Sequence, residues 1–435
     1  MSVHSQINEL IGNLNHDHMD VRLDSLKKLM EKIEAGEIER PLTGDDVNNH
    51  IHTFYSFSPY SPTKAIWMAY MSGLSTAGIM DHDSISGAEE FTAAGKIAGI
   101  ATTIGVECRV NLSGTPLSGK RINNPDQISI AYIALHGIPH TQIGRVKEYF
   151  EQYSVYRNLR NRLMIGKINN DLSNFDLSLN FERDVIPLSR FAEGGSITER
   201  HILYALSLKL VDAYGKGPEL VAFLKEQLNL GISGKIENYL RDAGNTFYEY
   251  DLLGLLKSEL MGAFYMDATL ECPDVKEVIA FSNSIGAISA YAYLGDVGNS
   301  VTGDKKAQKF EDDYIDLLFN VIKELGFNAV TYMPSRNSRE QLDILRKLCS
   351  KYGFLQISGE DINTPRQSFI CEAMRNAEFK NLYDATWALI GHELSATSSL
   401  ENGMFSAPVI CKYPGLEDRI NLYKDIARNR RSAIT

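Results

Sequence analysis

Three short polar segments contain residue types that bind metal ions in proteins. They are His50-Ile-His52, Asp81-His82-Asp83 and Gly105-Val106-Glu107. Residues i and i+2 of a strand lie on one face, so His50 and His52 can direct two imidazoles to one point. Imidazole and carboxylate groups are common metal ligands, and a divalent ion can activate water for hydrolysis. We therefore predict a divalent metal site built from these segments.

Each segment also has an ordinary structural explanation. His-x-His pairs occur widely without a metal, Asp81 to Asp83 could cap a helix that begins near Ser86, and a lone Gly-Val-Glu is uninformative. The second and third segments, however, follow apolar runs that are typical of buried strands, at residues 77–80 and 100–104. Parallel strands that end in polar residues place those residues at one mouth of a barrel. The order and spacing of the segments therefore favour a shared site.

The surrounding sequence predicts an α/β fold in which strands and helices alternate. Further strands are expected at 128–135, 287–293, 329–333 and 354–358, and helices at 62–70, 86–97, 275–284, 312–325 and 339–352. The strand signal disappears between 141 and 244, where apolar residues recur at helical spacing over 146–164, 197–211 and 220–228. We expect this segment to be a helical insertion over the barrel mouth.

The chain is therefore expected to have four parts. A helical N-terminal extension covers 1–40, the barrel covers 41–140 and 245–370, the insertion covers 141–244, and a C-terminal helical segment covers 371–435. The extension is predicted to contain two helices with a break near His16, Asp17 and His18. These three residues could form a second metal cluster. Short polar runs between helices are usually turns, however, so we expect an ordinary linker.

Composition is typical of a globular protein of the cytoplasm. No apolar run approaches the ~20 residues that cross a bilayer, and the N-terminus lacks a signal-peptide pattern, so we expect no membrane association. The five cysteines are scattered without Cys-x-x-Cys spacing, which argues against a disulfide framework or a zinc ribbon. The net charge of −11 argues against binding to extended nucleic acid, so any nucleotide ligand should be small. The oligomeric state stays open.

Five motifs together resemble those of a known enzyme family. They are His50-Ile-His52-Thr53 with Ser56 and Ser61-Pro62, Asp81-His82-Asp83, Gly105-Val106-Glu107, Thr198-Glu199-Arg200-His201 and Ser358-Gly359-Glu360-Asp361. They resemble the PHP (polymerase and histidinol phosphatase) superfamily of metal-dependent phosphoesterases, especially its stand-alone phosphatases of nucleoside 3',5'-bisphosphates and short oligonucleotides. The resemblance implies a distorted, TIM-like (β/α)7 PHP barrel whose helical insertion shapes the substrate pocket.

The resemblance also implies a ligand set for the metal. The ligands of the first metal in the family correspond here to His50, His52, Glu107 and Asp361. Other residues replace most ligands of the second and third metals; by our alignment they are Ser129, Ala292, Phe57 and Asn363. His82 is the one retained ligand of the third metal. We therefore expect about one divalent ion, zinc, manganese or iron, in each chain.

Loss of the neighbouring metals would leave a phosphate group dependent on cationic side chains. Arg109 is our first candidate for this role and Arg366 the second, although either could form an ordinary surface salt bridge. His82 and Asp83 are candidates for a proton shuttle and its orienting partner. His201, in the Thr-x-x-His motif of the resemblance, is a candidate for substrate contact, with packing as the alternative.

The leading interpretation is a metal-dependent hydrolase, a phosphoesterase that acts on a small nucleotide-like or sugar phosphate through metal-activated water. Two alternatives stay open. The protein could be a degenerate member of the PHP fold that binds a metal and a ligand without catalysis. It could also be a mononuclear amidohydrolase-type enzyme that cleaves carbon–nitrogen bonds, since related metal barrels work with one ion.

Overall fold

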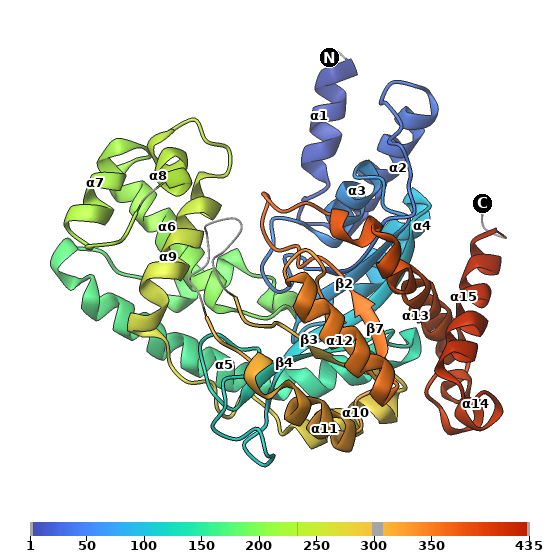
Figure 1. The fold of residues 1–435 in the computed structure, drawn as a ribbon. Coiled ribbons are helices and arrows are strands. Elements are labelled where there is room, and N and C mark those ends of the chain that lie inside the picture. The colour runs from blue at the N-terminus through green and yellow to red at the C-terminus, as the bar shows by residue number, and fades with distance from the viewer. Residues whose placement is uncertain (1–2, 233, 298–307, 433–435) are drawn as a thin grey trace.

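A curled sheet of seven strands forms the centre of the protein (Figure 1). The computed structural model describes residues 3–232, 234–297 and 308–432. The strands follow one another in chain order and are β1 (Val47–Ile51), β2 (Thr76–His82), β3 (Ala101–Asn111), β4 (Ile130–His136), β5 (Ile288–Ala292), β6 (Ala329–Tyr332) and β7 (Leu355–Ser358). The mixed α/β class and the predicted strands are thus confirmed.

The two edges of the sheet meet next to the first histidine motif. Ile51 forms a parallel bridge with Ile362, which lies just after β7. The backbone N–H of Ile362 donates to the carbonyl of His50 (3.0 Å), and the N–H of His52 donates to the carbonyl of Ile362 (2.9 Å). A Cβ atom at Gly359 would lie only 2.7 Å from the His50 nitrogen, so this close approach requires glycine. The segment that carries Asp361 is therefore fixed beside β1.

One strand departs from simple alternation. Strand β4 is antiparallel to both β3 and β5, whereas the other neighbouring strands are parallel. The connection between β3 and β4 contains no helix among residues 112–129. A parallel neighbour needs a long crossover, usually a helix, so this connection returns the chain antiparallel. The beginning of β4, and not its end, therefore lies at the mouth where β3 ends.

Helices cover the outside of the curled sheet. They are α3 (Pro62–Met71), α4 (Ala88–Ala98), α10 (Val275–Ile285), α11 (Ile315–Leu325) and α12 (Arg339–Tyr352), which confirms the helices predicted between strands. Their apolar faces and the outer faces of the strands form one large hydrophobic cluster. The C-terminal helices are α13 (Lys380–Ser398), α14 (Ala407–Lys412) and α15 (Leu416–Ser432). Helix α13 contacts β1, β3 and β7, and it shares a hydrophobic cluster with residues of β2, β4, β5 and β6.

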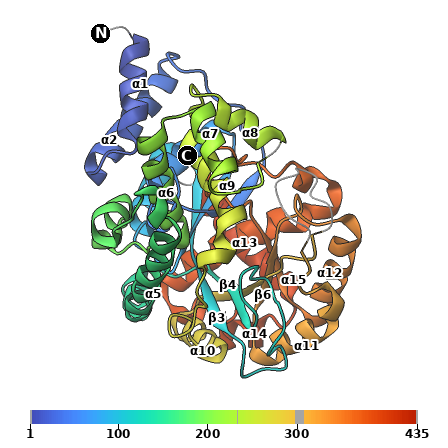
Figure 2. The same ribbon diagram turned by 90° about the vertical axis from the view of Figure 1, so that its left-hand side faces the viewer.

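The long helical segment between β4 and β5 forms a separate layer beside the sheet (Figures 1 and 2). It contains α5 (Ile143–Asp171), α6 (Glu199–Tyr214), α7 (Pro218–Glu226), α8 (Gly234–Arg241) and α9 (Tyr248–Phe264). These helices share a hydrophobic cluster of their own. Helix α9 belongs to the same cluster, so this layer continues past residue 244. We call residues 143–264 the insertion helices.

The N-terminal helices α1 (Val3–Asn13) and α2 (Met19–Glu34) pack on the outer surface near α3 and α4. A buried ion pair between Arg22 and Glu90 joins α2 to α4. The Arg22 guanidinium also donates to the carbonyls of His16 and Asp17, which places those residues in the turn between the two helices. Across the part of the chain that the structure describes, none of the helices has the length and apolar character needed to cross a membrane.

Candidate metal centre

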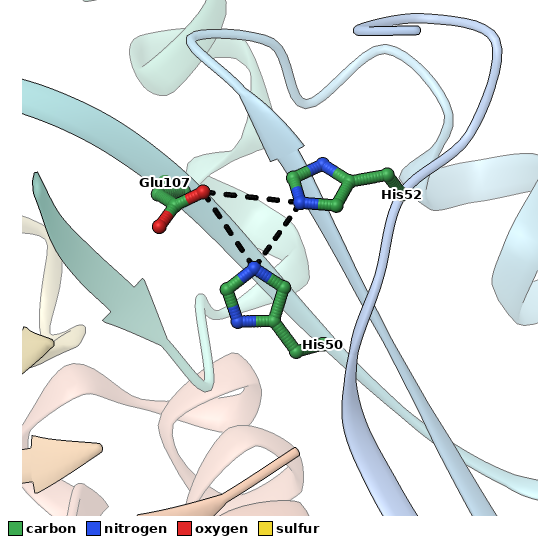
Figure 3. Close-up of side chains that lie close together, drawn as sticks. All are labelled: His50, His52 and Glu107. Carbon is green, nitrogen blue, oxygen red and sulfur yellow. Dashed lines mark hydrogen bonds and ion pairs between the residues drawn. The ribbon is translucent and has the colours of Figure 1, made fainter. Parts of the chain in front are cut away.

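The imidazoles of His50 and His52 meet at the carboxyl end of β1 (Figure 3). Their Nε2 atoms are 3.2 Å apart. The extended backbone places residues i and i+2 on one face, as predicted for this pair. His52 is buried, whereas His50 keeps limited access to solvent. Two histidine ligands are thus directed to one point.

Glu107 approaches the same point from β3. Its Oε2 atom lies 3.6 Å from His50 Nε2 and 3.8 Å from His52 Nε2. One potential ligand atom from each of these three residues lies within 4.8 Å of the other two. Asp361, outside this group of three, places its Oδ1 atom 3.2 Å from His52 Nε2. The structure therefore brings together all four residues predicted as ligands.

These distances fit a single metal ion. Two donors bound ~2.0–2.1 Å from zinc at a tetrahedral angle lie roughly 3.3 Å apart. The separations of 3.2 Å between the His50 and His52 nitrogens and 3.2 Å between His52 and Asp361 are close to that value. Glu107 and Asp361 also contribute two negative charges, which balance a divalent cation. Nitrogen and carboxylate donors of this kind suit zinc, manganese or iron.

A chain of hydrogen bonds sets the tautomer of His52. The Ser56 hydroxyl donates to Asp81 Oδ1 (2.6 Å), so its oxygen must accept at the 3.2 Å contact with His52 Nδ1. His52 Nδ1 then carries the proton, and Nε2 presents its lone pair to the centre. Asp81 is fully buried and also accepts from the Thr53 backbone (2.7 Å) and hydroxyl (2.6 Å). Sequence reasoning placed Ser56 and Asp81 in motifs but missed this supporting role.

The carboxylates of the centre are stabilised in their charged forms. Burial alone would raise the pKa of Glu107, but His82, His50 and His52 outweigh it and lower that pKa to about 2. Burial likewise opposes ionisation of Asp361, yet His52 and His50 hold its pKa well below the usual range. For His50, burial would lower the pKa, but Glu107 and Asp361 raise it above the usual 6.5. An ionised carboxylate is the form that binds a metal.

His82 lies beside Glu107. Its Nδ1 atom is 3.1 Å from Glu107 Oε2, and its ring lies 4.6 Å from that of His52. Burial is the main cause that lowers the pKa of His82 to about 3. The imidazole is therefore neutral near pH 7 and can donate Nδ1–H to the carboxylate. A group with so low a pKa is a weak base at neutral pH.

Asp83 and Arg109 belong to a second group of charges, which we call the buried ion-pair network. The six members are Asp83, Arg109, Arg157, Arg160, Glu199 and Glu271. Asp83 follows β2, Arg109 is in β3, Glu271 follows α9, and the other three residues are in α5 and α6. Asp83 pairs with Arg157 (2.6 Å), and Arg109 pairs with Glu199 (3.1 Å) and Glu271. Among the described residues, no hydrogen bond joins Asp83 to the His82 ring. The structure thus gives both residues partners other than those predicted.

The remaining predicted substrate contacts are also engaged elsewhere. His201 is buried, and its Nδ1 atom accepts from the backbone N–H of Thr198 (3.0 Å) in a capping box at the start of α6. Arg366 donates twice to Asp251 (2.6 and 2.7 Å) and lies over the ring of Tyr239. These contacts are those of a helix cap and a surface ion pair.

The structure also changes one position in the alignment of missing ligands. Ser129 precedes β4, and its hydroxyl accepts from the Gly119 N–H (2.7 Å). Tyr132 is the residue of β4 whose ring lies beside His82, at 5.8 Å between ring centres. Because β4 is antiparallel to β3, the first residues of β4 lie beside the last residues of β3, and Tyr132 is opposite Arg109. A tyrosine, rather than a serine, therefore occupies the part of β4 next to the centre.

Comparisons with known proteins give limited similarity. No family model matches the chain. Over 65 residues the chain is 37% identical to the 5'-3' exoribonuclease of Haemophilus influenzae, an alignment that covers 15% of this chain and 24% of that protein. The chain thus spans about a quarter of the length of this curated relative.

Two solved structures are similar over most of their length. One is described as a metal-dependent phosphoesterase from Bifidobacterium adolescentis, with 17% identity, a TM-score of 0.48, and coverage of 78% of this chain and 96% of that one. The other is an amidohydrolase from Chromobacterium violaceum, solved with sulfate and without metal, with 15% identity, a TM-score of 0.49, and coverage of 75% and 90%. At these low values, any functional assignment depends on the residues of the site itself.

Proposed function

We propose that this protein is a hydrolase that uses one divalent metal ion and acts on a small nucleotide-like or sugar phosphate. The observation that carries the proposal is the convergence of His50, His52 and Glu107, with Asp361 beside them. The same four positions match the ligands implied by the resemblance to the PHP superfamily. A divalent ion, when bound there, supplies a Lewis acid and lowers the pKa of water toward ~7.

The residues of the chain have distinct tasks in this proposal. Glu107 and Asp361 supply the negative charge that holds the ion, and Ser56 fixes the orientation and tautomer of His52. His82 is assigned to support Glu107 through its Nδ1–H, because its low pKa disfavours proton transfer near neutral pH. The Tyr132 ring lies beside His82, whereas the Phe57 ring packs against His201 and Tyr204 of the insertion helices.

The test combines metal analysis with an activity screen. Elemental analysis of the purified protein should find about one transition metal per chain, and phosphate esters should be hydrolysed with zinc, manganese or iron present. The Glu107→Gln variant is the matched control and should lose both properties. Hydrolysis of amide substrates alone would instead support the carbon–nitrogen hydrolase. Metal binding without hydrolysis of any substrate would support the non-catalytic alternative.

The partner of this site is proposed to be a small molecule. The net charge of −11 disfavours a long polyanion, whose binding depends on many cationic contacts. Short oligonucleotides and mononucleotides therefore belong in the screen together with sugar phosphates. Cleavage that increases with the length of a nucleic acid would contradict this part of the proposal.

A further inference from the structure

Two cationic side chains of the insertion helices lie near the metal centre without an ion-pair partner. Arg200 is in the first turn of α6, and Lys257 is in α9. The hydrophobic cluster of the insertion helices joins α6 to α9. Within the part of the chain that the structure describes, no carboxylate oxygen lies within the 4.0 Å ion-pair distance of either group. Both side chains are partly exposed, so a ligand can reach them.

Contacts of the two residues that precede Arg200 locate the start of α6 at the mouth of the sheet. The N-cap of this helix is Thr198, whose hydroxyl donates to the Ser56 carbonyl (3.3 Å). On another side Glu199, the first residue of α6, pairs with Arg109 of β3 (3.1 Å). Burial lowers the pKa of Arg200, whereas Asp361, Tyr132 and Glu199 favour its charged form. Asp361 lies 3.2 Å from His52, and the Tyr132 ring lies 5.8 Å from the His82 ring. Arg200, the next residue of α6 after Glu199, therefore lies at the mouth, within electrostatic reach of Asp361.

Lys257 lies close enough to Arg200 for the two charges to repel each other. The Arg200 charge is the largest cause that lowers the pKa of Lys257 to about 8, followed by burial. Asp126, Asp361 and Glu199 act in the opposite direction without overcoming it. Two adjacent cations are stabilised when an anion lies between them. The pair is thus arranged for an anionic ligand beside the metal centre.

Four other arginines of this region are already neutralised, and Arg336 donates to the carbonyl of Leu294 (3.1 Å). Arg109, Arg157 and Arg160 each pair with carboxylates of the buried ion-pair network. Arg366 is held by Asp251. An anion that enters the mouth would have to displace those carboxylates to reach any of these four arginines, whereas Arg200 and Lys257 require no such exchange.

We propose that Arg200 and Lys257 form an anion clamp that binds a dianionic phosphate group of the substrate beside the metal. This inference rests on the proposed function and adds the residues and the charge state that select the substrate. A guanidinium can offer two parallel N–H donors to phosphate oxygens, and an ammonium adds a second positive charge. The two positive charges match a phosphate dianion, whereas a neutral amide substrate would leave both cations unpaired.

The clamp can be tested without turnover by titrating the full-length protein with sulfate, a dianion that does not hydrolyse. Calorimetry should show that Arg200→Gln and Lys257→Met each weaken sulfate binding about tenfold or more. Lys209→Gln is the matched control, because Lys209 is also in α6 but pairs with Asp184 at the surface. Binding to Lys209→Gln should equal that of the wild type. Equal binding by all four proteins, or no sulfate binding by the wild type, would overturn the proposal.

A pH series gives an independent readout for Lys257. Sulfate stays dianionic between pH 6.5 and 9.5, while Lys257, with a pKa of about 8, loses its charge as the pH rises through that value. The charged groups that act on Lys257 are Arg200, Asp126, Asp361 and Glu199. The ordinary pKa values of arginine and of carboxylic acids lie outside this pH range. Wild-type affinity should therefore fall above pH 8, and Lys257→Met should show no such fall. A parallel fall in both proteins would contradict the clamp.

Steady-state kinetics separate the failure of the clamp from the failure of the proposed function. If a phosphate ester is hydrolysed, the two clamp variants should raise KM at least fivefold while Lys209→Gln leaves it unchanged. Hydrolysis with unaltered KM and unaltered sulfate binding in the variants would reject the clamp alone. Sulfate binding that depends on Arg200 and Lys257, without hydrolysis of any ester, would reject the proposed catalysis and retain the clamp.

Discussion

Two groups of charged residues lie side by side at the carboxyl ends of β2 and β3, and they differ in how their charges are balanced. The buried ion-pair network contains three arginines and three carboxylates, so its formal charges sum to zero. The candidate metal centre contains two carboxylates, Glu107 and Asp361, beside histidines and without an arginine or lysine among its four predicted ligands, so a divalent cation would balance its two carboxylate charges. The two groups therefore have different roles. The buried ion-pair network links the insertion helices to the sheet, whereas the candidate metal centre has the charge to bind a cation.

The comparison also explains why a charged residue two positions from a metal ligand need not contact substrate. Glu107 and Arg109 are on the same strand and face, yet Glu107 joins the centre while Arg109 joins the network. The carboxylates of Glu199 and Glu271, which come from the insertion helices and the segment after them, decide the difference. Helices α6 and α9 instead supply two cations, Arg200 and Lys257, that have no carboxylate at ion-pair distance among the described residues.

The largest expected effect is on stability, from Glu271→Gln. This change leaves Arg109 and Arg160 buried with one neutral partner in place of a carboxylate, which should reduce the free energy of unfolding by roughly 3–5 kcal/mol. Chemical denaturation followed by circular dichroism measures the loss. Glu182→Gln, which removes the exposed partner of Arg162, is the control and should cost less than ~1 kcal/mol. Similar losses in both variants would show that the network is not a stabilising unit.

For Glu107→Gln we expect a large loss of metal affinity and little change in stability. The substitution replaces an anionic ligand with a neutral one of the same shape, so affinity for zinc should fall at least ~100-fold, since even outer-shell changes cost 10–100-fold. The melting temperature of the metal-free protein should change little. Competition with a chromogenic chelator measures the affinity. If Glu107→Gln keeps the full metal content and activity, the metal site lies elsewhere in the molecule.

An intermediate effect is expected for Asp83→Asn. Because Asp83 pairs with Arg157, the variant should lose ~1–3 kcal/mol of stability while its metal content stays near normal. A double-mutant cycle with Arg157→Gln should give a coupling energy of similar size. Activity should be retained at temperatures well below melting. A large fall in turnover number without loss of stability would restore the predicted role of Asp83 in orienting a proton carrier.

The smallest effect concerns the pH dependence of metal binding. His50 has a raised pKa, above 6.5, because Glu107 and Asp361 favour its charged form over the opposing effect of burial. The metal requires an unprotonated nitrogen, so zinc affinity should fall as the pH drops through this pKa, by at most ~1.4 kcal/mol per pH unit for one proton. Calorimetry in buffers of different ionisation enthalpy should detect the released proton. His140→Asn, which removes a histidine paired with Glu393, should leave the proton release unchanged.

Local sequence patterns were sufficient to predict most strands of the sheet and the ligand residues of the metal centre. Apolar runs located the strands that carry Asp81 and Glu107, although β3 continues past Glu107 to Asn111. The i, i+2 spacing of His50 and His52 placed both rings on one face. The direction of β4 was not predicted, because the antiparallel return depends on a connection without a helix rather than on the strand's own residues. For the same reason Ser129 was aligned where the structure places Tyr132.

By itself the sequence determined which residues could bind a metal, because ligand type and strand periodicity are local properties. It could not determine which cations remain available to a ligand. Arg109, Arg366, Arg200 and Lys257 all have the same kind of charge in the sequence. Only the tertiary structure brings Glu199, Glu271 and Asp251 to the first two and leaves the last two without a carboxylate at ion-pair distance among the described residues. Ion pairing depends on distances between segments far apart in the chain. The packing of the insertion helices against the sheet sets these distances, and the local sequence does not contain them.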